Sequence, residues 1–151
     1  MSADPMGPAW VAGLATAEDK PVLVALRRRV FVEEQGVPAE LEQDELDGEA
    51  IHAVVRHGRG DVVGTGRLLV KPGGVARIGR MAVSEEARGR GAGSAVLTAL
   101  EAAAADAGCH RVELSSQVHA IGFYRRAGYE QVGGTFEEAG IPHVAMAKNL
   151  S

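Results

Sequence analysis

The sequence holds a single cysteine, Cys109. No disulfide can therefore form within the chain, and a cysteine-based zinc site is excluded. This cysteine usage is typical of proteins in the reducing cytoplasm, where we expect this protein to reside. Cys109 stands just before a predicted strand, so we expect a small buried hydrophobic residue there, with thiol chemistry as the alternative.

Long apolar runs and a surplus of basic residues are also absent. No stretch of about 18 apolar residues occurs, so no membrane-spanning helix is expected. The first residues lack the basic patch and apolar core of a signal peptide. Lysine and arginine number 16 against 20 aspartate and glutamate, a formal net charge of -4, which argues against nucleic-acid binding. We predict no membrane partner, no nucleic-acid partner and no metal.

Apolar residues, in contrast, make up 46% of the 151 positions. A chain of this length and composition is expected to form one domain with a sizeable core. We assign that domain to residues 9–151. Residues 1–8, with Pro5, Gly7 and Pro8, are expected to be a flexible tail.

Hydrophobic periodicity divides the chain into strands and helices. Thr16 and Asp19 form a weak capping box ahead of the first helix. Helices are predicted over residues 20–34, about 94–107 and 118–127. Strands are predicted over residues 10–15, 51–56, 62–70, 75–83, 111–115, 129–136 and 143–147. The last two strands flank a turn at Gly140-Ile141-Pro142, and the acidic residues 40–49 form either a short helix or an irregular loop.

This order of elements predicts an α/β fold with a mixed sheet of about six to seven strands flanked by helices. It does not fit a doubly wound Rossmann sheet, because three strands follow one another through short turns. The strands at 75–83 and 111–115 are joined through a helix, so we expect them to be parallel neighbours in the sheet.

A glycine- and arginine-rich segment, Arg88–Gly93, separates one of these strands from the second helix. Glycines let the backbone approach a ligand closely, and a helix N-terminus presents unpaired N–H groups to an anion. The segment lacks the lysine of a P-loop and the third glycine of a dinucleotide fingerprint. It predicts a site for a phosphate or pyrophosphate, although many short glycine patterns are ordinary turns.

Further motifs follow in a specific order. The strand Ile78–Val83 precedes the glycine-rich segment, and Ala120, Phe123-Tyr124 and Gly128-Tyr129 come after it. With these three elements the chain resembles the GNAT family of N-acetyltransferases, and the match covers nearly the whole sequence. Its N-terminal half resembles the ElaA-like branch of that family, through Leu26-Arg27-x-x-Val30-Phe31-Val32-x-Glu34-Gln35-x-Val37-Pro38, Glu42-x-Asp44-x-x-Asp47 and His52.

The resemblance implies the GNAT fold and acetyl-CoA as co-substrate. The backbone of Met81, Ala82 and Val83 would bind the pantetheine arm as an added strand does. The pyrophosphate would be held by Arg88, Gly89, Arg90, Gly91, Ala92, Gly93 and Ser94. Gln117 stands where many members have asparagine and is a further candidate for the pantetheine.

The implied reaction is transfer of an acetyl group to the primary amine of a small molecule, or of a protein, by direct attack. Tyr124 takes the place of the family's general acid; the alternative is a core tyrosine on a short amphipathic helix. His119 is either a base or proton relay, or a solvated or capping residue. Glu34 is a candidate proton acceptor.

Four residues are candidates for binding the acceptor: Arg80, Glu33, Asp47 and His52. Arg80 would bind an anionic group or form a buried ion pair, and His52 is equally a core residue. The acidic run that begins at Glu33 would attract a cationic amine, or would simply be a solvated loop. The alternative to an enzyme is a non-catalytic acyl-CoA sensor, or a binder of another nucleotide. A homodimer is compatible with the resemblance.

Overall fold

The computed structural model describes residues 10–38, 49–58 and 60–150. The predicted tail and the acidic segment up to residue 48 lie outside these ranges. The described strands are β1 (Trp10–Leu14), β2 (Ile51–His57), β3 (Val62–Lys71), β4 (Val75–Val83), β5 (Arg111–Gln117), β6 (Glu130–Glu138) and β7 (Ile141–Asn149). The helical elements are η1 (Ala17–Asp19), α1 (Lys20–Arg27), η2 (Arg28–Glu34), η4 (Glu85–Ala87), α3 (Ala92–Asp106), η5 (Val118–Ala120) and α4 (Ile121–Arg126).

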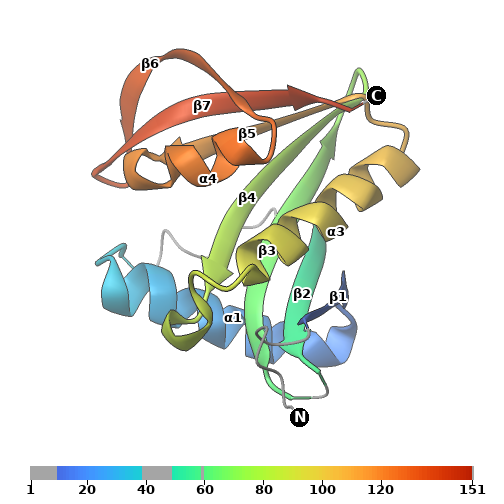
Figure 1. Ribbon diagram of the computed structural model, residues 1–151, viewed down its shortest axis with the longest axis vertical. Helices are drawn as coiled ribbons and strands as arrows, with labels where there is room; N and C mark the ends of the chain where they lie inside the picture. The colour runs from blue at the N-terminus through green and yellow to red at the C-terminus, as the bar shows by residue number, and fades with distance from the viewer. Residues whose placement is uncertain (1–9, 39–48, 59, 151) are drawn as a thin grey trace.

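All seven described strands form one sheet in the order β1-β2-β3-β4-β5-β7-β6 (Figure 1). Every neighbouring pair is antiparallel except β4 and β5, which are parallel as the sequence predicted. The α/β class and the mixed sheet are thereby confirmed. Helix α3 connects the two parallel strands, as a crossover must.

The parallel pairing is short, and this shapes the molecule. Strands β4 and β5 are paired only from Val75–Ile78 to Arg111–Leu114. Beyond that point β4 continues to Val83 and β5 to Gln117, and the two strands diverge (Figure 1). The sheet therefore opens beside the second half of β4.

A bulge bends β4 at the start of this opening. Thr65 of β3 pairs with Ala82, but Arg67 pairs with Gly79, so Arg80 and Met81 together oppose a single residue of β3. Arg80 has a φ of 54°, a left-handed conformation that is uncommon outside glycine. Such bulges redirect side chains and are frequent next to active sites.

The helices cover both faces of the sheet. Neighbouring residues of β2 show this, because Ala53 belongs to the core under α3 whereas Val54 belongs to the core under α1, and successive strand residues point to opposite faces. In the α3 core, Val96 and Leu100 are fully buried. Each such side chain stabilises the fold by about 1.5–3 kcal/mol.

The first predicted helix, over residues 20–34, changes type along its length. It is α-helical through Arg27 and then a π-helix, in which the Gln35 N–H donates to the Val30 carbonyl at 3.2 Å. Apolar spacing does not distinguish these two forms. At its start, the Thr16 N–H donates to the Asp19 carboxylate at 2.9 Å. This bond lowers the pKa of Asp19, helped by the ion pair with Arg56.

Other boundaries also differ from the prediction, most of them by one or two residues. Helix α3 begins at Ala92 instead of Ser94. The last turn is made by Ala139 and Gly140, with φ of 53° and 76°, which is the two-residue turn that joins hairpin strands best. Pro142 therefore lies inside β7, near its first residue, where a strand tolerates proline. None of the helices in the described part of the chain has the length and apolar character needed to span a bilayer.

Candidate active site

Two adjacent cavities open where β4 and β5 diverge. The first, which we call the loop cavity, has a volume of about 610 Å³ and lies against the glycine-rich segment. The second, the strand cavity, has a volume of about 520 Å³ and lies between η2, β4, β5 and the β6–β7 hairpin. Both are lined by Gln35, Met81, His119, Ala120 and Tyr124. The two cavities therefore meet at these five residues.

The glycine-rich segment has the backbone shape that its composition predicts. Gly89 and Gly91 have φ of 74° and 91°, values that favour glycine. Gly91 is the N-cap of α3, so the first N–H groups of that helix lie at the loop. The residues of the segment that line the loop cavity are Arg88, Gly89, Gly91, Gly93 and Ser94.

Two residues of the predicted pyrophosphate set do not line this cavity. The carbonyl of Arg90 accepts a hydrogen bond from Trp10 Nε1 at 2.6 Å. Ala92 is 1% exposed and packs in the core. The sequence predicted a continuous run, whereas the turn directs Arg90 and Ala92 away from the cavity that the other five residues line.

Arg88 links the end of β4 to the π-helix. Its Nε donates to the Val83 carbonyl at 3.0 Å, and its Nη2 donates to Glu34 Oε1 at 2.6 Å. Glu34, a predicted proton acceptor, therefore lies beside the loop and lines the loop cavity only. Met81, Ala82 and Val83 line the same cavity along the stretch of β4 that is not paired with β5.

The chain has two tyrosines, and their environments differ. Tyr129, the residue before β6, donates to Glu101 Oε2 of α3 at 2.8 Å. Burial raises the pKa of Tyr129, and the Glu101 carboxylate raises it further. Tyr124, on α4, lines both cavities and is 7% exposed. Burial raises the pKa of Tyr124 to about 12. Its phenol therefore stays protonated at neutral pH and can donate a proton.

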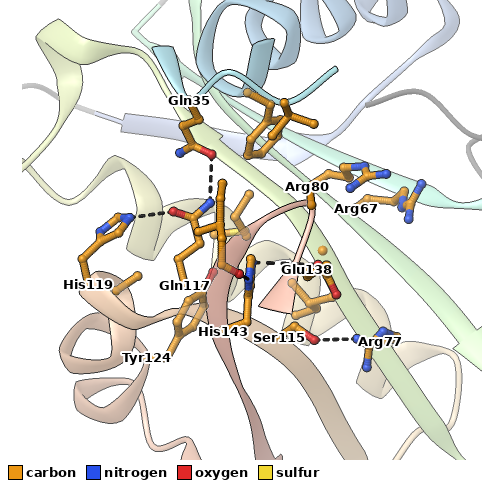
Figure 2. Close-up of a pocket in the computed structure, with 18 of the residues that line it drawn as sticks. Gln35, Arg67, Arg77, Arg80, Ser115, Gln117, His119, Tyr124, Glu138 and His143 are labelled. Atoms are coloured by element: carbon orange, nitrogen blue, oxygen red, sulfur yellow. Dashed lines mark hydrogen bonds and ion pairs between the residues drawn. The ribbon is translucent and has the colours of Figure 1, made fainter. Parts of the chain in front are cut away.

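A chain of hydrogen bonds crosses the opening between η2 and β5 (Figure 2). Gln117 Nε2 donates to Gln35 Oε1 at 2.8 Å, and Gln117 Oε1 lies 2.7 Å from His119 Nε2. Since an amide oxygen can only accept, His119 donates through Nε2. Both polar ends of Gln117 are thus engaged within the protein.

Arginines line one wall of the strand cavity. Arg67 of β3 and Arg77 and Arg80 of β4 contribute to it, and Arg77 donates to Ser115 Oγ at 2.8 Å. Figure 2 shows Arg67 and Arg80 on one side of His143 and His119 on the other. Arg80, a predicted acceptor residue, thus lines the strand cavity.

The other predicted acceptor residues lie elsewhere. Glu33 is exposed and lines neither cavity. His52 also lines neither; it lies in β2, where its carbonyl accepts from the Ala15 N–H at 2.7 Å. Asp47 falls outside the described residues.

Several polar residues of the strand cavity were given no role from the sequence, among them Gln35, Arg67, Arg77, Glu138 and His143. His143 is 7% exposed. Its position, as a polar residue opening the otherwise apolar run Val144–Ala147, was the one signal available. Gln35 was part of the motif that resembles the ElaA-like branch, but that resemblance assigned it no role.

Comparisons with known proteins give a consistent result. The family model described as the acetyltransferase (GNAT) domain matches residues 14–150. The uncharacterized N-acetyltransferase YjcF of Bacillus subtilis is 42% identical over 125 residues, covering 82% of this chain and 88% of that protein.

Solved structures agree. Escherichia coli ElaA superposes with a TM-score of 0.79 at 28% identity, over 93% of this chain and 99% of that one. An acyl-CoA N-acyltransferase from Pseudomonas aeruginosa superposes with a TM-score of 0.77 at 34% identity, over the same shares. The predicted fold is confirmed by these likenesses.

Proposed function

The chain belongs to the GNAT acetyltransferase family, and from this premise we propose that it transfers the acetyl group of acetyl-CoA to a primary amine. The observation that carries the proposal is the position of Tyr124, a buried tyrosine at the junction of two cavities. Two cavities that meet at a proton donor suit a reaction between two substrates. The single cysteine supports a cytoplasmic location.

The loop cavity has the features needed to bind acetyl-CoA. Gly91 and the N-terminus of the 15-residue helix α3 present N–H groups suited to a pyrophosphate, and Arg88 adds a positive charge. The stretch of β4 from Met81 to Val83 offers backbone groups to the pantetheine amides. These residues would hold the thioester close to Tyr124.

The strand cavity would hold the acceptor, and its volume of about 520 Å³ suits a small molecule or the side chain of a protein lysine. The amine attacks the thioester carbonyl directly, a C–N bond forms and the C–S bond breaks. Tyr124 gives its proton to the departing sulfur. Holding both reactants side by side supplies much of the rate enhancement.

The test is release of CoA from acetyl-CoA with a panel of amines: spermidine, glucosamine, free amino acids and a lysine peptide. For Tyr124→Phe we expect kcat to fall by about 10²-fold or more with an unchanged Kd for acetyl-CoA, because only the proton donor is lost. The matched control is Tyr129→Phe. It loses the hydrogen bond to Glu101 but no cavity contact, so it should cost about 1 kcal/mol of stability and little activity.

Two outcomes would contradict the proposal. Tight binding of acetyl-CoA without turnover of any amine would indicate an acyl-CoA sensor. Thermal stabilisation by ATP or NAD, but not by CoA, would indicate a different nucleotide. If kcat of Tyr124→Phe equals that of the parent, the transferase stands and the assignment of Tyr124 as the acid is wrong.

A further inference from the structure

His143 lies at the centre of the strand cavity (Figure 2). It belongs to β7, where it pairs with Gln117 of β5 on one side and with Phe136 of β6 on the other. Its ring stacks on Phe136, with centroids 6.1 Å apart and planes inclined by 25°. The side chain is 7% exposed. The imidazole is therefore held in one place by a strand that is paired on both sides and by a neighbouring aromatic ring.

The hydrogen bonding of the ring distinguishes its two nitrogens. Nδ1 lies 2.6 Å from the carbonyl oxygen of Ile141. A carbonyl can only accept, so Nδ1 carries a hydrogen, and Nε2 is the nitrogen that can take up a proton. This is how a general-base histidine is usually oriented, with one nitrogen fixed by an acceptor and the other available.

Charged groups from three strands line the cavity to which this ring belongs. Glu138 of β6 approaches Nε2 to 3.9 Å through Oε2, which is longer than a hydrogen bond and close enough to stabilise a positive imidazolium. Arg67 of β3, with Arg77 and Arg80 of β4, lines the same cavity. One carboxylate and three guanidinium groups thus lie around the cavity that the ring lines.

The other candidate bases are less well placed. His119 is exposed and already donates through Nε2 to Gln117. Glu34 is paired with Arg88 in the loop cavity. Neither side chain is both buried and part of the lining of the strand cavity, where the acceptor would bind.

We propose that Nε2 of His143 removes a proton from the ammonium group of the acceptor, an inference that rests on the proposed acetyl transfer. The resulting amine attacks the thioester carbonyl. Tyr124 protonates the sulfur and is reprotonated by the second proton that the nitrogen loses when the amide forms. His143 releases its proton to solvent. One ammonium and one thioester thus yield one amide, one thiol and one free proton.

The test compares His143→Asn with the parent, using the panel amine that the parent acetylates fastest. An asparagine amide nitrogen stands near the place of Nδ1 and can still donate to the Ile141 carbonyl, whereas Nε2 is lost. We expect kcat/KM at neutral pH to fall about 10²–10⁴-fold, with an unchanged Kd for acetyl-CoA. The matched control is His110→Asn, a histidine that also lies by a backbone carbonyl, at 3.1 Å from Gly73, but lines neither cavity.

The pH dependence separates a proton acceptor from a structural residue. A variant without the base depends on amine that is already deprotonated in solution, so its rate should rise about tenfold per pH unit. A structural defect would instead lower the rate by the same factor at every pH. Equal activity of His143→Asn and parent, or a parallel loss at all pH values, overturns the assignment. His143→Gln repeats the test if the first variant unfolds. Failure of the parent to acetylate any amine contradicts the proposed function instead.

Discussion

The two cavities that meet at Tyr124 differ in the kind of groups that line them. One wall of the loop cavity is a short stretch of backbone and small residues that includes Gly89, Gly91, Gly93 and Ser94, and side chains of η2 and α4 complete it. The strand cavity is formed by long polar side chains from β3, β4, β5, β6 and β7, among them Arg67, Arg80, Gln117, Glu138 and His143. The loop cavity depends on the backbone conformation of its glycine-rich wall. The strand cavity depends on the side chains that several strands contribute to it.

This difference bears on function. Backbone N–H groups recognise a pyrophosphate whatever the neighbouring side chains are, so a site of this kind suits a co-substrate shared by a whole family. A set of side chains drawn from separate strands can change one residue at a time. We therefore expect acceptor specificity to be determined in the strand cavity. Substitutions in the loop cavity should change the Kd of acetyl-CoA, and substitutions in the strand cavity should change the KM of the acceptor.

The largest of these effects is expected for Gly91→Val. Gly91 has a φ of 91° at the start of α3, where a β-branched residue is strained by about 1–3 kcal/mol. The strain should turn the loop N–H groups away from the ligand and raise the Kd for acetyl-CoA about 10–100-fold, measured by calorimetry.

The matched control for this substitution is Gly108→Val. Gly108 follows the other end of α3 with a φ of 85° and has open space around it, so the strain is similar and the cavity is remote. It should lower the melting temperature and leave the Kd unchanged. Equal effects of both variants on the Kd would mean that the loop acts only through stability.

A smaller effect is expected for Gln117→Ala. The substitution removes the hydrogen bond from Gln117 to Gln35 and the one from His119 to Gln117. Each is worth about 0.5–1.5 kcal/mol. The KM of the acceptor should rise about 3–10-fold while the Kd for acetyl-CoA is unchanged. Gln131→Ala is the control, because Gln131 donates to the Gly133 carbonyl on β6 and lines neither cavity. A matching rise in the Kd would instead place Gln117 on the pantetheine.

The same difference explains what the sequence could predict. The parallel neighbours β4 and β5 followed from the helix between them. The shape of the glycine-rich wall of the loop cavity followed from Arg88–Gly93, because it depends on residues close in the chain. The strand cavity depends on sheet order. Gln35 and Gln117 are separated by 82 positions, and His143 reaches the site only because β7 lies beside β5. Neither contact has a local sequence pattern.

Glu34 shows what a local pattern leaves open. As an acidic residue at a helix end, it was a reasonable candidate for the proton acceptor. Its surroundings are decided by Arg88, which lies 54 positions further along the chain. Because the two residues are far apart in the sequence, the ion pair could not be predicted. It holds Glu34 beside the loop cavity and not in the strand cavity.

The smallest effect is therefore expected for Glu34→Gln. The Glu34–Arg88 pair is partly exposed, with 41% of the arginine side chain and 32% of the glutamate side chain accessible, and pairs of this kind are worth about 0–1 kcal/mol. Without the competing carboxylate, Arg88 should bind the pyrophosphate slightly better, so the Kd for acetyl-CoA should fall by up to about threefold. The effect should shrink at high salt, because exposed charges are screened. Glu33→Gln, at an exposed neighbour that lines neither cavity, is the control. A fall in kcat of about 10²-fold for Glu34→Gln, with the Kd unchanged, would restore Glu34 as the proton acceptor and displace His143 from that role.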